Sequence, residues 1–149
     1  MTQPLDRIKA ARGAPPVVLI AEDDLDDRLF VEEGLHETAP GAKAVFVADG
    51  NEMLGYMHDC VDNGSPLPRL IILDINMPRK NGREALAELR ADKAFDNVPV
   101  IVFSTVRNSE AGDNLRELGA DQFISKPSRY NEYRGIFIDV SQRWLAEAS

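Results

Sequence analysis

The stretch Leu70-Ile-Ile-Leu-Asp-Ile-Asn-Met-Pro-Arg-Lys-Asn-Gly82 decides the fold. It opens with four consecutive apolar residues, a pattern typical of a short strand that is buried on both faces of a parallel sheet. A carboxylate, Asp74, follows at once, and Pro78 and Gly82 place a loop before the next helix. The segment Val17–Ala21 repeats this pattern, because it runs directly into further acidic residues. We therefore predict two parallel strands, each followed directly by an acidic residue.

The rest of the chain alternates strands with helices. Three more runs of strand type are Ala44–Ala48, Val100–Phe103 and Phe123–Ile124. Helical spacing marks the intervening segments at Leu25, Leu29 and Leu35; at Met53, Leu54 and Met57; at Ala85, Leu86 and Leu89; at Ala111, Leu115 and Leu118; and at Tyr133, Ile136, Phe137, Val140 and Trp144. This (βα)5 order predicts an α/β fold, a doubly wound five-stranded parallel sheet in the order 2-1-3-4-5 with helices on both faces. We expect one domain over residues 17–149, preceded by an N-terminal arm over residues 1–16.

Composition excludes several classes of protein. The 149 residues include 25 acidic and 17 basic side chains, and the net charge of −8 opposes binding to nucleic-acid phosphates. No apolar run approaches the roughly 20 residues that cross a bilayer, and the N-terminus lacks the apolar core of a signal peptide. The single cysteine, Cys60, excludes an intramolecular disulfide and a multi-cysteine zinc site. We expect a cytoplasmic protein.

Acidic side chains gather where the first and third strands end. In the predicted order these strands are neighbours, so Glu22, Asp23 and Asp74 meet at the switch point of the sheet. Their mutual repulsion favours a divalent cation, and magnesium suits a site made of a few carboxylates and water. The alternative for each acid is a structural role at the start of the next helix, as a charge that complements the helix dipole or as an N-cap, and we favour it for Asp24, Asp26 and Asp27.

The ends of the other strands carry groups that suit phosphoryl chemistry. A carboxylate such as Asp74 can act as a nucleophile toward phosphorus when a metal neutralises the phosphoryl oxygens. Ser104 follows the fourth strand and Lys126 follows the fifth, so they offer a hydrogen-bond donor and a positive charge. Helix capping by Ser104 and a solvated loop position for Lys126 are the plainer alternatives.

Together these motifs resemble the receiver domain of bacterial two-component response regulators, over about Val17 to Trp144. The motifs are the acidic pair, Asp-x-x-Met-Pro-x-x-x-Gly, a hydroxyl after the fourth strand and Lys-Pro after the fifth. The resemblance implies the following roles: phosphoacceptor for Asp74; magnesium ligands for Glu22, Asp23, Asp74 and the backbone carbonyl of Asn76; switch hydroxyl for Ser104; phosphoryl pairing for Lys126; and switch aromatic for Phe123. It also implies a cis Lys126–Pro127 bond.

The resemblance extends to stand-alone regulators that accept phosphate from phytochrome-type histidine kinases. It implies a phosphoacceptor signalling protein with self-catalysed phosphotransfer and autodephosphorylation, and we expect its output to pass through protein contacts. Two alternatives stay open. The protein can be a phosphate sink or phosphorelay intermediate, or an interaction domain that works without phosphorylation.

Three rival classes fail on particular residues. A haloacid dehalogenase-type enzyme needs a second Asp two residues after its nucleophile, and that position is Asn76. A flavodoxin-like carrier needs a first loop that accepts phosphate, and the acids after Ala21 would repel it. A calcium-binding EF-hand needs Gly at the sixth loop position, where this chain has Arg79.

The last helix predicts a contact between two copies of the chain. At 100° per residue, Ile138 and Leu145 fall about 140° and 120° from Tyr133, outside the arc that faces the core. A monomer would leave this second apolar stripe exposed. We expect a homodimer through the face made by the fourth helix, fifth strand and fifth helix. The plainer alternative is two scattered exposed apolar residues, which are common on soluble proteins.

Overall fold

Five parallel strands form one sheet in the computed structural model, which describes residues 15–105 and 114–146. The strands are β1 (Val17–Ala21), β2 (Lys43–Val47), β3 (Leu70–Leu73), β4 (Val100–Ser104) and β5 (Gln122–Ser125). Their order is β2-β1-β3-β4-β5, and every neighbouring pair is parallel. The predicted fold class and strand order are therefore confirmed. The predicted N-terminal arm lies, up to residue 14, outside the described residues, and so does Ala111.

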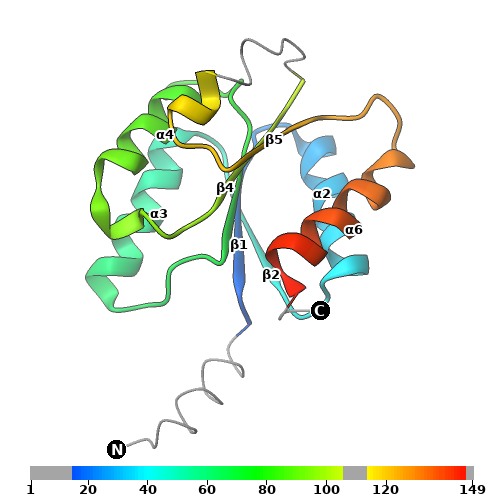
Figure 1. Cartoon of the computed structure of the whole chain (residues 1–149), viewed down its shortest axis with the longest axis horizontal. Helices are drawn as coiled ribbons and strands as arrows, with labels where there is room; N and C mark the ends of the chain where they lie inside the picture. Colours follow the sequence, from blue (N-terminus) through cyan, green and yellow to red (C-terminus); the bar gives the residue numbers. More distant parts are fainter. Residues whose placement is uncertain (1–14, 106–113, 147–149) are drawn as a thin grey trace, which may run out of the picture.

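Helices cover both faces of the sheet, as predicted. The structure assigns α2 (Leu25–Thr38), α3 (Gly50–Asn63), α4 (Gly82–Ala91), the short 3-10 helix η1 (Lys93–Phe95) and α6 (Glu132–Trp144). Figure 1 shows α2 and α6 on one side of the strands and α3 and α4 on the other. No helix in the described ranges is long and apolar enough to cross a membrane.

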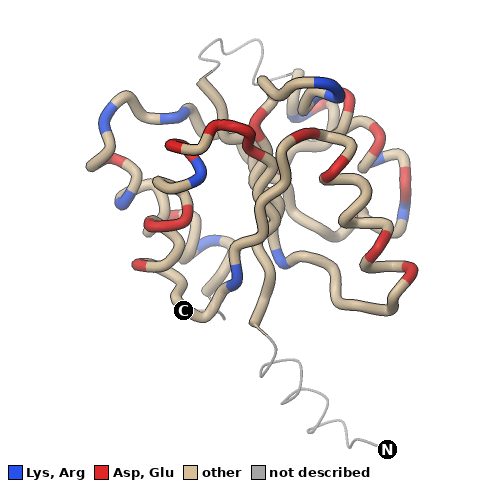
Figure 2. The backbone as a smooth tube through the Cα atoms, turned by 180° about the vertical axis from the view of Figure 1, so that it is seen from behind, with Lys and Arg blue, Asp and Glu red and all other residues tan. Residues whose placement is uncertain are grey.

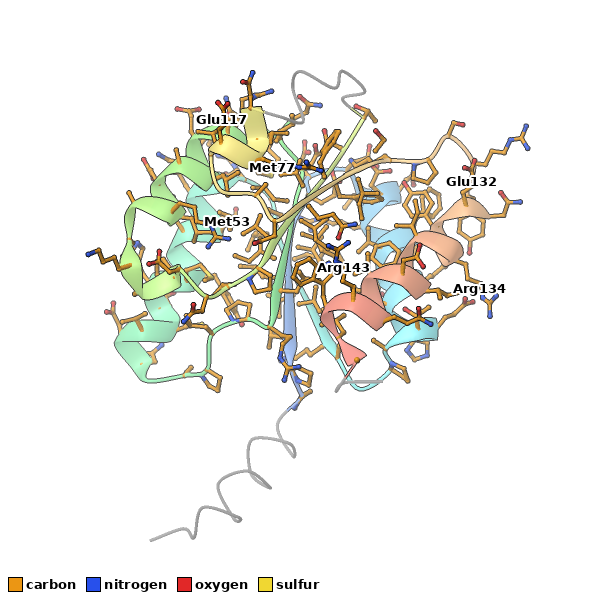
Figure 3. The ribbon with its side chains drawn as sticks, in the orientation of Figure 1. Met53, Met77, Glu117, Glu132, Arg134 and Arg143 are labelled. Atoms are coloured by element: carbon orange, nitrogen blue, oxygen red, sulfur yellow. The ribbon has the colours of Figure 1, made fainter. Side chains whose placement is uncertain are left out.

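The hydrophobic core has two halves because the central strands are buried on both faces. On β1, Leu19 packs on the side of α3 and α4, whereas Val18 and Ile20 pack on the side of α2 and α6. All four residues of β3 are buried. Figure 3 shows the side chains filling both layers, with Arg134 projecting outward from α6. Continuous apolar runs thus mark buried parallel strands, as the sequence predicts.

The predicted apolar face of α2 is wrong at two positions. Leu25 and Leu29 are 76% and 50% exposed, and the buried residues of this helix are Val31, Gly34 and Leu35. The reason is the close approach of α6, because a Cβ on Gly34 would lie 2.7 Å from the ring of Phe137. The face of α2 that packs therefore includes a glycine, which hydrophobic spacing cannot detect.

The predicted apolar stripe on α6 is also wrong. Leu145 is fully buried in the core beside α2 and α6, and Ile138 is half-buried. The helix ends at Trp144, and Leu145 leaves it with φ −127° and ψ 22°. A projection at 100° per residue therefore does not apply at Leu145. The homodimer prediction therefore loses the apolar stripe that supported it.

Candidate functional site

The carboxyl ends of four strands bring the predicted site residues together. Glu22 follows β1, Asp74 follows β3, Ser104 ends β4 and Lys126 follows β5. All four side chains are buried, with exposed fractions of 6% or less. Three of them, all except Ser104, help to line an open hollow. Its lining residues are Glu22, Asp23, Asp24, Leu25, Asp26, Asp27, Asp74, Asn76, Thr105 and Lys126. Figure 2 shows the run of acidic positions where β1 passes into α2.

Lys126 is the centre of the charge network. Its Nζ lies 2.6 Å from Glu22 Oε1, 2.7 Å from Asp27 Oδ2 and 2.9 Å from Asp74 Oδ2. Burial alone would lower the pKa of Lys126, but the hydrogen bonds to Asp27, Glu22 and Asp74 outweigh it and raise the pKa. The side chain therefore carries its positive charge among three carboxylates.

Three carboxylates lie close enough to share a divalent cation. Oxygens of Glu22, Asp23 and Asp74 all lie within 4.8 Å of one another. Burial raises the pKa of Glu22 to about 7, with the negative charge of Asp74 adding to the rise and hydrogen bonding to Lys126 opposing it. A cation at this point would relieve the crowding of negative charge, and an oxygen-only set of ligands fits Mg²⁺ or Mn²⁺.

Three donors orient the carboxylate of Asp74. Ser104 Oγ donates to Oδ1 at 3.0 Å, the backbone N–H of Asn76 donates to the same oxygen at 3.0 Å, and Lys126 Nζ donates to Oδ2. The Asn76 side chain in turn donates from Nδ2 to Ser104 Oγ at 3.3 Å. The hydroxyl and the ammonium thus lie beside the Asp74 carboxylate, where they could stabilise further negative charge.

The loop after Asp74 is held in place from both ends. A Cβ on Gly82 would lie 2.5 Å from the Cα of Ile75, so this position accepts only glycine without a shift of backbone. Arg79, whose φ is 58°, forms an ion pair at 2.5 Å with the buried carboxylate of Asp49. The Gly50 N–H also donates to the Lys80 carbonyl at 2.9 Å. These contacts fix the loop that carries Asn76.

The N-cap role holds for one of the three acids at the start of α2. Asp24 is the N-cap and accepts from the Asp27 N–H at 3.0 Å. Asp26 is exposed in the first turn. Asp27 also lies in the first turn, where its charge complements the helix dipole as predicted, and its side chain in addition pairs with Lys126, which was not predicted. Side chains in a helix lean toward its N-terminus, so an acid in the first turn of α2 can reach back over the strand ends, a signal that the sequence contained.

Phe123 and Pro127 complete the predicted set. Phe123 lies opposite Val102 in the sheet and is half-buried against the core beside α3 and α4. The Lys126–Pro127 bond is trans, so the cis bond that the resemblance implied is wrong for this structure. A trans bond is the form that most X–Pro peptides adopt, and Lys126 reaches its carboxylate partners with it.

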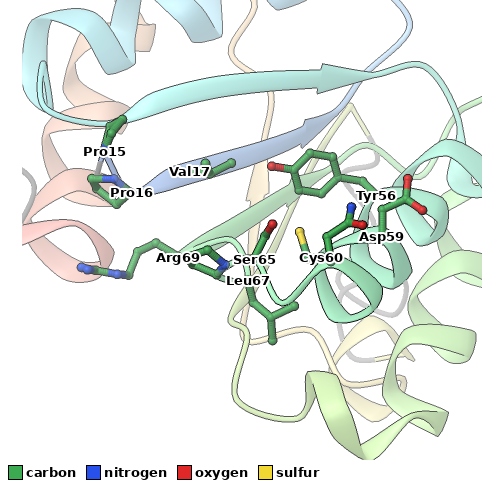
Figure 4. A pocket seen from close by; sticks show the side chains of 11 residues that line it. Pro15, Pro16, Val17, Tyr56, Asp59, Cys60, Ser65, Leu67 and Arg69 are labelled. Atoms are coloured by element: carbon green, nitrogen blue, oxygen red, sulfur yellow. The ribbon is translucent and has the colours of Figure 1, made fainter. Parts of the chain in front are cut away.

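A second hollow lies at the other end of the strands, where β1 and β3 begin. Figure 4 shows Tyr56 and Cys60 of α3 facing the start of β1, with Arg69 and Leu67 closing the other side. Burial raises the pKa of the Cys60 thiol above its ordinary value, which disfavours the reactive thiolate. This hollow shares no residue with the one at the carboxyl ends of the strands.

Comparisons with known proteins agree with this geometry. The family model described as the response regulator receiver domain matches residues 18–136. The chain belongs to this family.

Three related response regulators are similar over nearly their whole length. Rcp1 of Synechocystis is 28% identical over 132 residues, which cover 88% of this chain and 90% of Rcp1, and the crystal structure of its Mn²⁺-bound form has a TM-score of 0.79. The phosphorylated cyanobacterial phytochrome response regulator RcpA has a TM-score of 0.82 at 29% identity, over 91% of this chain and 98% of RcpA. The response regulator RPA3017 in red light signalling of R. palustris has a TM-score of 0.79 at 30% identity, over 90% and 96% of the two chains.

Proposed function

We propose that this receiver protein accepts a phosphoryl group on Asp74 from a phosphorylated histidine of a sensor kinase. The observation that carries the proposal is the buried Asp74 carboxylate. It lies beside Glu22 and Asp23 on one side and accepts hydrogen bonds from Ser104 and Lys126 on the other. A carboxylate held in this way suits nucleophilic attack on phosphorus, with donors ready for the charge that develops.

The transfer exchanges one bond to phosphorus for another. A carboxylate oxygen of Asp74 attacks the phosphorus, the new P–O bond forms, and the P–N bond to the donor histidine breaks. The histidine nitrogen keeps the electron pair of that bond, and Lys126 and Ser104 hydrogen-bond the transferred group. Glu22, Asp23, Asp74 and the backbone carbonyl of Asn76 would hold Mg²⁺, which supplies neutralisation of the phosphoryl oxygens when bound.

The response to phosphorylation would begin at Ser104 and Phe123. Ser104 is fully buried and already donates to Asp74, so a small movement would bring its hydroxyl to a phosphoryl oxygen. Phe123 is half-buried on the neighbouring strand and would fill the space that the hydroxyl leaves. The same site would catalyse its own dephosphorylation by water. The signal would then pass to a protein partner in the cytoplasm.

A phytochrome-type histidine kinase is the partner that we propose. Support comes from the similar proteins, since RcpA is named as a phytochrome response regulator and RPA3017 as a regulator in red light signalling. No photoreceptor or kinase motif occurs in this chain, so light sensing would belong to the partner.

Phosphotransfer from purified histidine kinases tests the function. Each kinase is phosphorylated, mixed with the full chain and Mg²⁺, and the chain is assayed by intact mass. We expect rapid transfer from a phytochrome kinase and none after chelation of the metal. Rapid return of the phosphoryl group to the kinase would favour the phosphate-sink or relay alternative. A chain that takes no phosphoryl group from any kinase or from acetyl phosphate would contradict the proposal and favour an interaction domain.

A further inference from the structure

Asp27 is one of three carboxylates that bind Lys126, but it does not belong to the group of carboxylates that could hold a metal ion. The oxygens that can share a cation belong to Glu22, Asp23 and Asp74, whereas Asp27 stands outside that group. Nevertheless, Asp27 Oδ2 lies 2.7 Å from Lys126 Nζ, a distance typical of a charge-assisted hydrogen bond. Asp27 therefore binds the lysine without an evident role toward the cation.

Asp27 also joins two helices to the loop after β5. Its backbone N–H donates to Asp24 Oδ1, which anchors the residue in the first turn of α2. Its second carboxylate oxygen lies 3.5 Å from the hydroxyl of Tyr133, at the start of α6. Tyr133 is 5% exposed, and its burial together with the negative charge of Asp27 raises the pKa of its hydroxyl to about 12. The hydroxyl therefore remains protonated and able to donate to Asp27.

We propose that Asp27 is a positioning residue that competes with the phosphoryl group on Asp74 for Lys126. Without phosphorylation, Asp27 holds the ammonium; with it, the lysine turns to the phosphoryl oxygens and Asp27 keeps only its contact with Tyr133. This inference rests on the proposed function of Asp74.

Charge explains why the exchange can occur. Lys126 supplies one positive charge to three carboxylates at 2.6 to 2.9 Å, so none of them is fully neutralised. Phosphorylation replaces the single negative charge of the Asp74 carboxylate with close to two negative charges on three strong acceptor oxygens, at a side chain already in contact with the lysine. The side chain of Asp27 is 24% exposed, so water can solvate its carboxylate once the lysine leaves. The exchange therefore favours the phosphoryl group, and Asp27, which loses the lysine, is the most exposed of the three carboxylates.

The exchange also changes the contact between α2 and α6. Asp27 draws the Lys126 loop toward α2 in the unphosphorylated protein, and Tyr133 packs against Phe30 of α2 with ring centroids 5.2 Å apart. When Asp27 loses the ammonium, its remaining partner among these groups is the Tyr133 hydroxyl, and that hydrogen bond should shorten. Phosphorylation would thus change the contacts of Tyr133 at the start of α6, independently of any movement of Ser104 and Phe123.

Binding of beryllofluoride, a phosphoryl mimic, tests the competition. Calorimetric titrations in Mg²⁺ compare the wild type with Asp27→Asn and with Asp26→Asn, which removes the same charge one residue away. We expect Asp27→Asn to bind roughly fivefold more tightly, the change that corresponds to a partly exposed ion pair, and Asp26→Asn to stay within about twofold, as a screened surface charge should. Asp27→Glu, which keeps the charge, should restore an affinity close to that of the wild type.

Fluorotyrosine labelling tests the link to α6. The chain has three tyrosines, so ¹⁹F NMR gives three resonances, and Tyr133→Phe assigns the one of interest. We expect beryllofluoride to shift the Tyr133 resonance in the wild type and much less in Asp27→Asn. Tyr56, on the other side of the sheet, is the internal control and should not shift.

The outcomes separate the inference from the function on which it rests. A wild type that binds no beryllofluoride in Mg²⁺ contradicts the proposed function, and therefore also the inference that rests on it. A wild type that binds, with Asp27→Asn no tighter than Asp26→Asn, overturns the competition alone. A full shift of the Tyr133 resonance in Asp27→Asn overturns the link to α6.

Discussion

Lys126 and Arg90 lie at opposite ends of the strands and bind different kinds of partner. Lys126 lies where the strands end, which we call the carboxyl edge, and binds three carboxylates. Arg90 lies where the strands begin, which we call the amino edge, and donates to the carbonyls of Phe95, Val98 and Gly119 at 2.8 to 2.9 Å. Arg90 also pairs with Asp121 at 3.1 Å, and that carboxylate accepts the Val100 N–H at 2.8 Å.

The difference shows how one fold combines a fixed edge with a reactive one. Backbone carbonyls are anchored by the chain around them, so the Arg90 contacts are complete within the folded protein. Carboxylates carry full charge, and a single lysine cannot neutralise three of them, so the carboxyl edge gains from an added cation or from the exchange of a partner. The amino edge therefore serves stability, and the carboxyl edge suits chemistry.

The largest expected effect is the loss of phosphorylation on changing Asp74. Asp74→Asn removes the proposed nucleophile, so the variant should take up no phosphoryl group from acetyl phosphate or from a phosphorylated kinase, measured by intact mass. Asp24→Asn is the matched control, because asparagine can keep the helix cap. Equal labelling of the wild type and Asp74→Asn would contradict the assignment.

Loss of Arg90 should destabilise the fold and leave the carboxyl edge intact. Arg90→Met strands three carbonyls and Asp121, which should lower the free energy of unfolding by about 3 kcal/mol. Urea denaturation measures this loss, and Arg134→Met, which breaks an exposed ion pair, should cost far less. Phosphorylation of folded Arg90→Met should proceed at the wild-type rate; a severe loss would mean that the two edges are not independent.

Loss of Lys126 should destabilise the protein in a way that magnesium reverses. Lys126→Met leaves Glu22, Asp27 and Asp74 without the ammonium that they share. The free energy of unfolding should fall by about 2 kcal/mol, which is less than for breaking a fully enclosed ion pair, because the hollow opens to water. Thermal unfolding with and without Mg²⁺ measures the effect. Mg²⁺ should stabilise Lys126→Met more than it stabilises the wild type or the exposed control Lys43→Met. Equal stabilisation of all three would argue against a shared charge site.

The smallest effect should come from the ion pair between Arg79 and Asp49. The Glu52 N–H and the Arg79 guanidinium hold the pKa of Asp49 below its ordinary value of 3.8, against the opposing effect of burial. Because Arg79 is 63% exposed, Arg79→Gln should cost less than about 1 kcal/mol at pH 7. A lowered pKa stabilises the fold above the ordinary value and loses that contribution as the pH falls through the lowered one.

The difference between Arg79→Gln and the wild type should therefore shrink below the ordinary Asp pKa and disappear only below the lowered pKa of Asp49. Urea denaturation at neutral and acid pH measures it, with Arg116→Gln as the control for loss of a surface charge. A difference that persists unchanged in acid would show that Arg79 acts through packing and not through Asp49.

Much of the fold follows from local pattern. Apolar runs of two to five residues identify the strands. The structure shifts β2 one residue earlier than predicted, to Lys43–Val47, extends β4 to Ser104, and extends β5 one residue further at each end. The predicted strand order is the common one for a five-stranded sheet built from five βα units with right-handed crossovers. Because carboxyl ends of adjacent parallel strands share one edge, the meeting of Glu22, Asp74, Ser104 and Lys126 could be predicted as well.

The sequence by itself thus determined the strands, their order and the side chains at the strand ends, because these depend on short-range pattern and on general rules of chain topology. Only the tertiary structure decided which helix residues are buried and which acid binds Lys126. Gly34 lies in the core face of α2 because the ring of Phe137 needs its space, and Leu145 is buried because α6 ends just before it. Asp27 pairs with a lysine 99 residues away because helix packing, which local periodicity does not encode, aims its side chain over the sheet edge.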